Sequence, residues 1–169
     1  IEAKYLKVVR RDEPPVYRER AYCYELYHRL RLQLTDKFPY TLHGEIDKKG
    51  HGVVCDAFRD SPKPNPDFVV HRPGFSDNLA VIEVKPSSFS LSAGRDDVKK
   101  IRTFIERVHY HVGVFLVFGP DENNRAEGLT KQLSIGSHKA DDQLLVIWHK
   151  AIGQGGYEIL WEPKSQHLG

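Results

Sequence analysis

Apolar positions along the chain change from helical to extended spacing, and this pattern predicts an α/β fold. Residues 16–34 carry apolar side chains on one helical stripe, which predicts a helix. The stripe consists of Tyr22, Cys23, Leu26, Tyr27, Leu30 and Leu34. Residues 41–47 alternate apolar and polar side chains, as a half-buried strand does. Two apolar runs, 68–70 and 79–82, predict a pair of buried strands, because turn-forming residues lie between them.

The second half of the chain predicts another helix and three more strands. Asp96 and Asp97 are acidic residues suited to a helix N-terminus. The apolar face that follows them consists of Val98, Ile101, Phe104, Ile105 and Val108. Residues 112–118 are almost continuously apolar, which is typical of a strand covered on both faces. Residues 144–149 and 157–161 flank a glycine-rich turn and predict a β-hairpin.

These elements predict a single domain over residues 1–169. Its core, at about 16–118, has the order helix, three strands, helix, strand, and places a central mixed sheet between helices. The C-terminal extension, at about 119–169, adds the β-hairpin. Within it, the polar segment 121–142 is either a helix or a mobile loop.

Two short motifs place ionisable groups at the edges of the buried strands. Asp67 follows Pro66 and opens the run 68–70, whereas Glu83 and Lys85 close the run that begins at Leu79. Residues two apart share a strand face, so Glu83 and Lys85 project together, and a hairpin would bring Asp67 beside them. Burying such charges is unfavourable by several kcal/mol unless they pair or hold a metal. Oxygen-ligated divalent cations commonly relieve the repulsion between two carboxylates.

Pro66-Asp67 followed by Glu83-x-Lys85 resembles the PD-(D/E)xK phosphodiesterase superfamily, which includes restriction endonucleases and Holliday-junction resolvases. The resemblance implies a restriction-endonuclease-like core, αβββαβ, and Mg²⁺-dependent hydrolysis of nucleic-acid phosphodiester bonds in defence or repair. It implies that Asp67, Glu83 and the Val84 carbonyl bind Mg²⁺, with Mn²⁺ as a substitute. Lys85 would stabilise the developing charge and position the attacking water. DNA is favoured over RNA as the substrate.

Nucleases of this kind often add a glutamate from the first helix. Glu19 falls near the centre of the apolar stripe and Glu25 falls off it, so Glu19 is the favoured auxiliary ligand to metal or water. The alternative is that Glu19 is a first-turn glutamate favoured by the helix dipole. His43, Glu45 and Asp47 share a strand face, and they either extend the acidic cluster or form the wet side of an edge strand. We favour the second.

Composition limits the classes of function. The chain has 25 basic and 23 acidic residues, a net charge of +2, so it lacks the strongly basic footprint of a tight nonspecific nucleic-acid binder. Basic residues do cluster on the two predicted helices. They are Arg18, Arg20, Arg29 and Arg31 on the first, and Lys99, Lys100 and Arg102 on the second. Solvated helix faces are favoured for both clusters, with phosphate contact as the alternative.

Other chemistries are poorly represented. Cys23 and Cys55 are too few for a disulfide framework or a zinc knuckle, and Cys23 is expected to be a buried core thiol. His109 and His111 form an H-x-H pair that we interpret as chance rather than a zinc site. We find no membrane-spanning stretch and no signal peptide, which predicts a cytoplasmic protein. The chain begins at Ile1 and has no methionine, so we expect a piece of a longer sequence.

Two rival hypotheses remain open beside a nuclease. In the first, the domain has lost catalysis and serves as a nucleic-acid-binding or assembly module. In the second, the motifs are coincidental in an ordinary α/β domain. Divergence of the three charged side chains in space would favour coincidence. The sequence leaves open whether the chain forms a homodimer or joins a larger complex. It also leaves open the specificity, and whether cleavage occurs within a strand or from an end.

Overall fold

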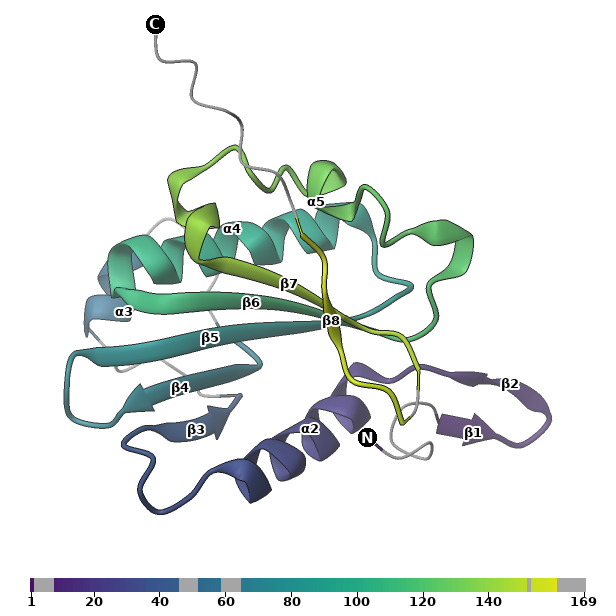
Figure 1. Ribbon diagram of the computed structural model, residues 1–169, viewed down its shortest axis with the longest axis horizontal. Helices are drawn as coiled ribbons and strands as arrows, with labels where there is room; N and C mark the ends of the chain where they lie inside the picture. The colour runs from purple at the N-terminus through teal and green to yellow at the C-terminus, as the bar shows by residue number, and fades with distance from the viewer. Residues whose placement is uncertain (2–7, 46–51, 59–64, 152, 161–169) are drawn as a thin grey trace, which may run out of the picture.

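A mixed six-stranded sheet forms the centre of the molecule, in a computed structural model that describes residues 1, 8–45, 52–58, 65–151 and 153–160 (Figure 1). Its strands are β3 (Thr41–Gly44), β4 (Phe68–Arg72), β5 (Asp77–Pro86), β6 (Tyr110–Phe118), β7 (Leu144–His149) and β8 (Tyr157–Glu158), and they lie side by side in this order. β3, β4 and β5 run antiparallel, β6 and β7 are parallel to β5, and β8 is antiparallel to β7. The predicted α/β class with a central mixed sheet is confirmed.

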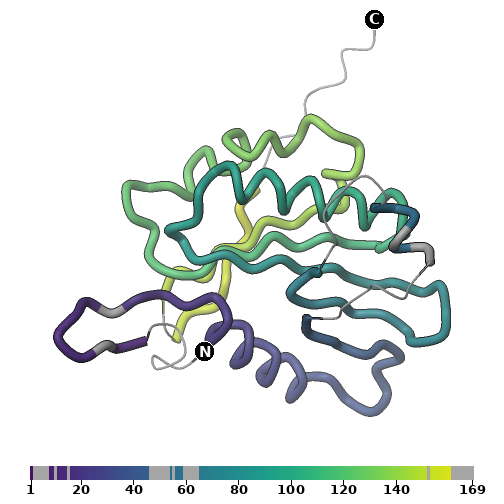
Figure 2. The backbone as a smooth tube through the Cα atoms, turned by 180° about the vertical axis from the view of Figure 1, so that it is seen from behind, coloured from purple at the N-terminus to yellow at the C-terminus, as the bar shows by residue number. Residues whose placement is uncertain are grey.

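Two helices cover opposite faces of this sheet. α2 (Glu19–Gln33) lies on one side and α4 (Leu91–Val108) on the other, as both views of the backbone show (Figures 1 and 2). Successive strand residues point to opposite faces, so each helix meets a different set of side chains. On β5, Val81 packs into the cluster beneath α4, whereas Ile82 and Val84 pack with α2. The core therefore consists of two hydrophobic clusters separated by the sheet.

Short elements complete the layer on the α4 side. α3 (Gly52–Ala57) packs against α4, where the rings of Phe58 and Phe104 lie 4.9 Å apart. The segment 121–142, left open between helix and loop, contains η1 (Glu122–Asn124), α5 (Leu129–Gln132) and most of η2 (Lys139–Gln143). It is therefore a series of short helical turns.

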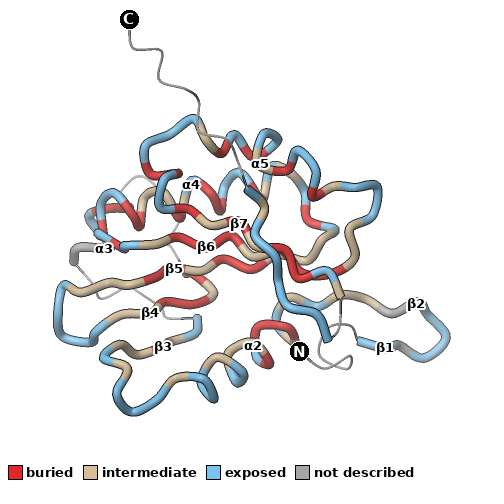
Figure 3. Tube along the Cα trace, in the orientation of Figure 1, coloured by how far each residue is buried: buried red, intermediate tan, exposed pale blue. Residues whose placement is uncertain are grey.

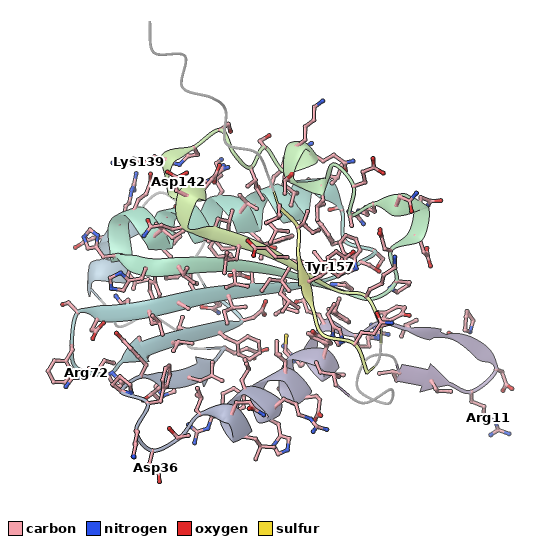
Figure 4. All side chains as sticks on the ribbon, viewed as in Figure 1. Arg11, Asp36, Arg72, Lys139, Asp142 and Tyr157 are labelled. Atoms are coloured by element: carbon pink, nitrogen blue, oxygen red, sulfur yellow. The ribbon has the colours of Figure 1, made fainter. Side chains whose placement is uncertain are left out.

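Several predicted boundaries are wrong. The first helix begins at Glu19, because the preceding residues form a hairpin of β1 (Val8–Arg10) and β2 (Glu13–Val16), which was not predicted. This hairpin projects to one side of the sheet with Arg11 near its tip (Figure 4). The strand predicted over 41–47 ends at Gly44, and Glu45 has a positive φ of 42°. Asp47 lies outside the described residues.

The second helix also begins earlier than predicted. Ser90 is its N-cap, and the Ser90 hydroxyl accepts a hydrogen bond from the Ala93 N–H at 3.3 Å. Asp96 and Asp97 therefore lie in the second turn rather than at the N-terminus, and Asp97 is buried. The predicted C-terminal strand pair is present as β7 and β8, although residues 161–169 of the predicted second strand and beyond lie outside the described part.

Candidate functional site

The motif residues meet where β4 begins beside the C-terminal half of β5. The antiparallel register pairs Phe68 with Ile82, so Asp67 precedes β4 at the level of Glu83. The Val84 N–H donates a hydrogen bond of 2.7 Å to Oδ2 of Asp67. The β4–β5 hairpin therefore holds the Asp67 carboxylate against the strand that carries Glu83 and Lys85, as the sequence predicted.

Glu83 is buried on the α4 side of the sheet, with 2% of the residue exposed. Its Oε1 lies 2.8 Å from Nζ of Lys100, which α4 supplies. Burial raises the pKa of Glu83 to about 8, and the negative charges of Asp67 and Asp97 act in the same direction, while Lys100 opposes them. Without a bound cation other than this ammonium, Glu83 therefore favours its protonated form at neutral pH.

Lys85 links the two sides of the site. Its Nζ lies 3.3 Å from Glu19 Oε2 and 3.3 Å from Asp97 Oδ2, and donates a 3.3 Å hydrogen bond to the Val84 carbonyl. Burial alone would lower the pKa of Lys85, but Asp97 and Glu19 outweigh it and the net pKa is raised. The ammonium therefore stays charged, clamped between a carboxylate from α2 and one from α4.

The α2 side of the cluster is also acidic. Burial raises the pKa of Asp67, the hydrogen bond from Val84 lowers it, and the charge of Glu19 raises it again, for a net increase. Cys23 is a free, buried thiol whose pKa is raised by burial and then by Asp67 and Glu19. Cys23 is thus an un-ionised thiol of the core, in agreement with the prediction of a core residue.

The structure brings five of the predicted site residues together. Glu19, Asp67, Glu83, Val84 and Lys85 join one network of hydrogen bonds, ion pairs and mutual charge effects. Their head groups converge. The hypothesis of coincidental motifs therefore lacks the divergent side chains that would have supported it.

The competing glutamates lie elsewhere. Glu25 is buried, contrary to its position off the apolar stripe, and its Oε1 is 2.6 Å from Nε of Arg29. Glu45 is exposed and pairs with Arg20 at 3.5 Å, although its backbone N–H donates to the Asp67 carbonyl at 2.9 Å. The Glu45 backbone therefore borders the cluster, while its side chain is exposed to solvent.

Sequence reasoning missed Asp97 and Lys100. Both come from α4, and Lys100 Nζ lies 3.1 Å from Asp97 Oδ1 as well as near Glu83. A signal for Asp97 was present, because it lies four residues before Ile101 and therefore on the apolar face of the helix. The same test singled out Glu19 on the first helix. Because Asp97 was assigned to the helix N-terminus, its place on the apolar face was overlooked.

The oxygen donors of the cluster suit a hard divalent cation. Among the described residues, no group of three or more His, Cys, Asp or Glu side chains is arranged to hold a metal ion. Mg²⁺, however, is usually bound by one or two carboxylates, with water and phosphate oxygens completing its shell. Asp67, Glu83 and the Val84 carbonyl offer such a set, and the Lys100 ammonium already supplies positive charge at Glu83. These oxygen atoms are of the kind that Mg²⁺ and Mn²⁺ prefer.

The histidine pair at the end of α4 is not part of a metal cluster in the described part of the chain. His109 caps α4 in the left-handed conformation, with φ of 61°, and His111 is exposed on β6.

Comparisons with protein-family models, with curated proteins and with solved structures found no match for this chain. No helix within the described ranges is long and apolar enough to cross a membrane.

Proposed function

We propose that this chain is a divalent-metal-dependent nuclease that hydrolyses phosphodiester bonds of nucleic acid, DNA in preference to RNA. The observation that carries the proposal is the convergence of Asp67, Glu83 and Lys85 from adjacent strands, with Glu19 reaching Lys85 from α2. The order of α2, β3, β4, β5, α4 and β6, with β6 parallel to β5, agrees with the αβββαβ core that the PD-(D/E)xK resemblance implies. α3 is an addition between β3 and β4.

Asp67, Glu83 and the Val84 carbonyl are the residues that would hold Mg²⁺ or Mn²⁺. Such an ion, when bound, lowers the pKa of a coordinated water and neutralises charge on the phosphate. Glu83 has a pKa of about 8, so its carboxyl group must lose a proton at neutral pH before it binds a cation. The Lys100 ammonium, 2.8 Å from Glu83 Oε1, must also move away from that oxygen.

Lys85 and Glu19 pair with each other beside the candidate metal ligands. The Lys85 ammonium stays charged and donates to a non-bridging phosphate oxygen, where it stabilises the charge that develops as the bond breaks. Glu19 is the more exposed partner, with 38% of its side chain accessible against 17% for Lys85. Its carboxylate orients the attacking water and accepts a proton from it. Asp97 holds Lys85 from the opposite side.

The test compares isosteric variants with neighbours outside the cluster. Asp67→Asn and Lys85→Met should lower Mg²⁺-dependent cleavage of a labelled duplex and a labelled single strand by at least about 100-fold. Asp96→Asn and Lys99→Met, at exposed positions on α4, should cleave as the wild type does. Circular dichroism checks that every variant is folded. Undiminished Mg²⁺-dependent cleavage by either site variant would refute the proposal.

A second candidate is a nuclease-like domain without catalysis that serves as a nucleic-acid-binding or assembly module. The observation that favours it is the 2.8 Å contact between Lys100 Nζ and Glu83 Oε1, because an internal ammonium can replace a lost metal permanently. Titration of the wild type with Mg²⁺ and Mn²⁺ separates the two candidates. Binding of the labelled duplex with no cleavage at any metal concentration would favour the inactive module.

A further inference from the structure

The outward face of α2 carries cations, whereas its two carboxylates contact Lys85 and Arg29. The exposed residues of the helix are Arg20, Tyr24, His28, Arg29, Arg31, Leu32 and Gln33, and its N-cap Arg18 is exposed as well. The two acidic residues of α2 both turn inward. Glu19 contacts Lys85 in the candidate site, and Glu25 is 6% exposed against Arg29. The most exposed charged residues of the helix are therefore basic.

Three of these residues form a row that begins at the site. Tyr24 and Arg31 follow Arg20 by four and by eleven residues, which places the three on one side of the helix over about three turns, or roughly 16 Å. Arg20 directly follows Glu19. Arg20 pairs with Glu45 at 3.5 Å, and both side chains are more than half exposed. The pair therefore contributes little to stability, and a ligand can easily replace Glu45. Tyr24 is 64% exposed, an unusual exposure for an aromatic ring.

The cations of α4 are used differently. Arg102 forms a two-point ion pair with Asp141, which is fully buried, and Lys100 lies within the candidate site. Arg95 and Arg107 donate to backbone carbonyls of Gln132 and Ala57. Most basic side chains of α4 therefore hold the protein together, whereas those of α2 project into solvent beside the acidic cluster.

We propose that the row Arg20, Tyr24 and Arg31, here called the α2 basic face, docks the phosphate backbone of a nucleic-acid ligand. This rests on the proposed function, which supplies the class of ligand, and it specifies where the ligand lies. Charge complementarity carries the argument, because the protein as a whole is nearly neutral at +2 while the charged residues of this row are both basic. Contacts of this kind are independent of base sequence. Tyr24 adds an exposed ring that packs on a sugar or base.

The test measures binding in the absence of cleavage. A short labelled duplex, in buffer with EDTA, is titrated with the protein at several KCl concentrations by fluorescence anisotropy. Each phosphate contact contributes about 0.9 to the slope of log affinity against log salt. The double variant Arg20→Gln/Arg31→Gln should lower that slope by about 2 and the low-salt affinity by at least about 10-fold. Tyr24→Ala should lower the affinity with the slope unchanged.

A matched control removes the same charge from the other side of the sheet. Lys131 on α5 and Lys139 on η2 are exposed, and Lys139 lies on the side opposite α2 (Figure 4). Lys131→Gln/Lys139→Gln should keep both slope and affinity within about twofold of the wild type. Equal losses in the two double variants, or no salt-dependent binding by the wild type, would overturn the docking face.

The two proposals fail separately. If the wild type never cleaves but binds in a salt-dependent way, and only the α2 double variant loses that binding, the docking face is supported and the nuclease is refuted. A wild type that cleaves with Mg²⁺, while the α2 double variant binds and cleaves like the control, refutes the docking face and leaves the nuclease standing.

Discussion

The two main helices are attached to the sheet in opposite ways. α4 buries seven residues, namely Gly94, Asp97, Val98, Ile101, Phe104, Ile105 and Val108, whereas α2 buries Tyr22, Cys23 and Glu25. Figure 3 shows the same contrast, with buried positions along α4 and mainly exposed positions along α2. α4 connects the parallel strands β5 and β6 and therefore lies directly over the centre of the sheet.

Because of this difference, we expect α4 to contribute mainly to stability and α2 mainly to contacts with a ligand. α4 supplies the buried side of the candidate site through Asp97 and Lys100, and its other cations support the surrounding loops. α2 supplies one partly exposed carboxylate, Glu19, and an outward basic face. Paired substitutions on the two sides of the sheet test this division, since the same chemical change should destabilise the protein more on the α4 side than on the α2 side.

The largest effect is expected from removing the buried ion pair of α4. Arg102→Met leaves Asp141, which is 0% exposed, without its cation and should lower the free energy of unfolding by about 3–5 kcal/mol. Arg31→Met makes the same change at an exposed position of α2 and should alter stability by no more than about 0.5 kcal/mol. Urea denaturation measures both. Similar losses in the two variants would remove the distinction between the helices.

Close packing under α4 gives the next effect. A Cβ added at Gly113 would lie 2.1 Å from Cγ2 of Ile101 and 3.0 Å from Cδ1 of Ile105, so Gly113→Ala forces α4 away from β6. We expect a loss of about 1–3 kcal/mol in unfolding free energy. At Gly44, on the α2 side, the nearest atom would be in the Phe68 ring at 3.5 Å, an ordinary contact. Gly44→Ala should be neutral within about 0.5 kcal/mol, and a larger loss there would contradict loose packing on that side.

The buried acid of the site should make stability depend on pH. In metal-free protein the pKa of Glu83 is raised from 4.5 to about 8, mainly by burial, so the folded state holds a proton that the unfolded state has lost between these values. Stability therefore falls as pH rises from about 5 to about 8. The raised pKa of Asp67 acts in the same direction.

Glu83→Gln isolates this effect from the titration of histidines. Denaturation is measured in EDTA across the pH range for the wild type and the variant, and the wild-type curve should fall relative to that of the variant. A difference between them that does not change with pH would mean that Glu83 ionises normally, with Lys100 offsetting its burial completely.

The smallest effect is expected at the helix N-termini. Ser90 caps α4 through a side-chain hydrogen bond, and Ser90→Ala should cost about 0.5–1 kcal/mol. Arg18 occupies the same position on α2 and makes no side-chain cap bond, so Arg18→Ala should change stability by less than about 0.5 kcal/mol. Thermal unfolding followed by circular dichroism compares them, and a greater loss at Arg18 would reverse the expected order.

The central fold was predictable because its elements have clear periodicity. The strands around Asp67 and Glu83 alternate between two covered faces, and the apolar face from Val98 to Val108 marks α4. The β1–β2 hairpin was not predictable in the same way, since β2 contains Pro14 and Pro15, residues that normally argue against a strand. α3 is six residues long, too short for a helical period to appear.

The candidate site was predictable in part for the same reason. Asp67, Glu83 and Lys85 follow from strand geometry, and Glu19 follows from its place on an apolar stripe. Lys100 depends on how α4 rotates above β5, which is a property of tertiary packing and has no local signature. The inward turn of Glu25 toward Arg29 likewise reflects packing rather than spacing.

The sheet ends in short strands on both sides. β3 has four residues, and β8 has two, both of them exposed. An unpaired strand edge is a template on which other chains can add, and shortness is one of the ways in which proteins suppress this. The long, apolar β6 is enclosed between β5 and β7, so its backbone is withheld from such pairing. The arrangement should keep concentrated protein from assembling into fibrils.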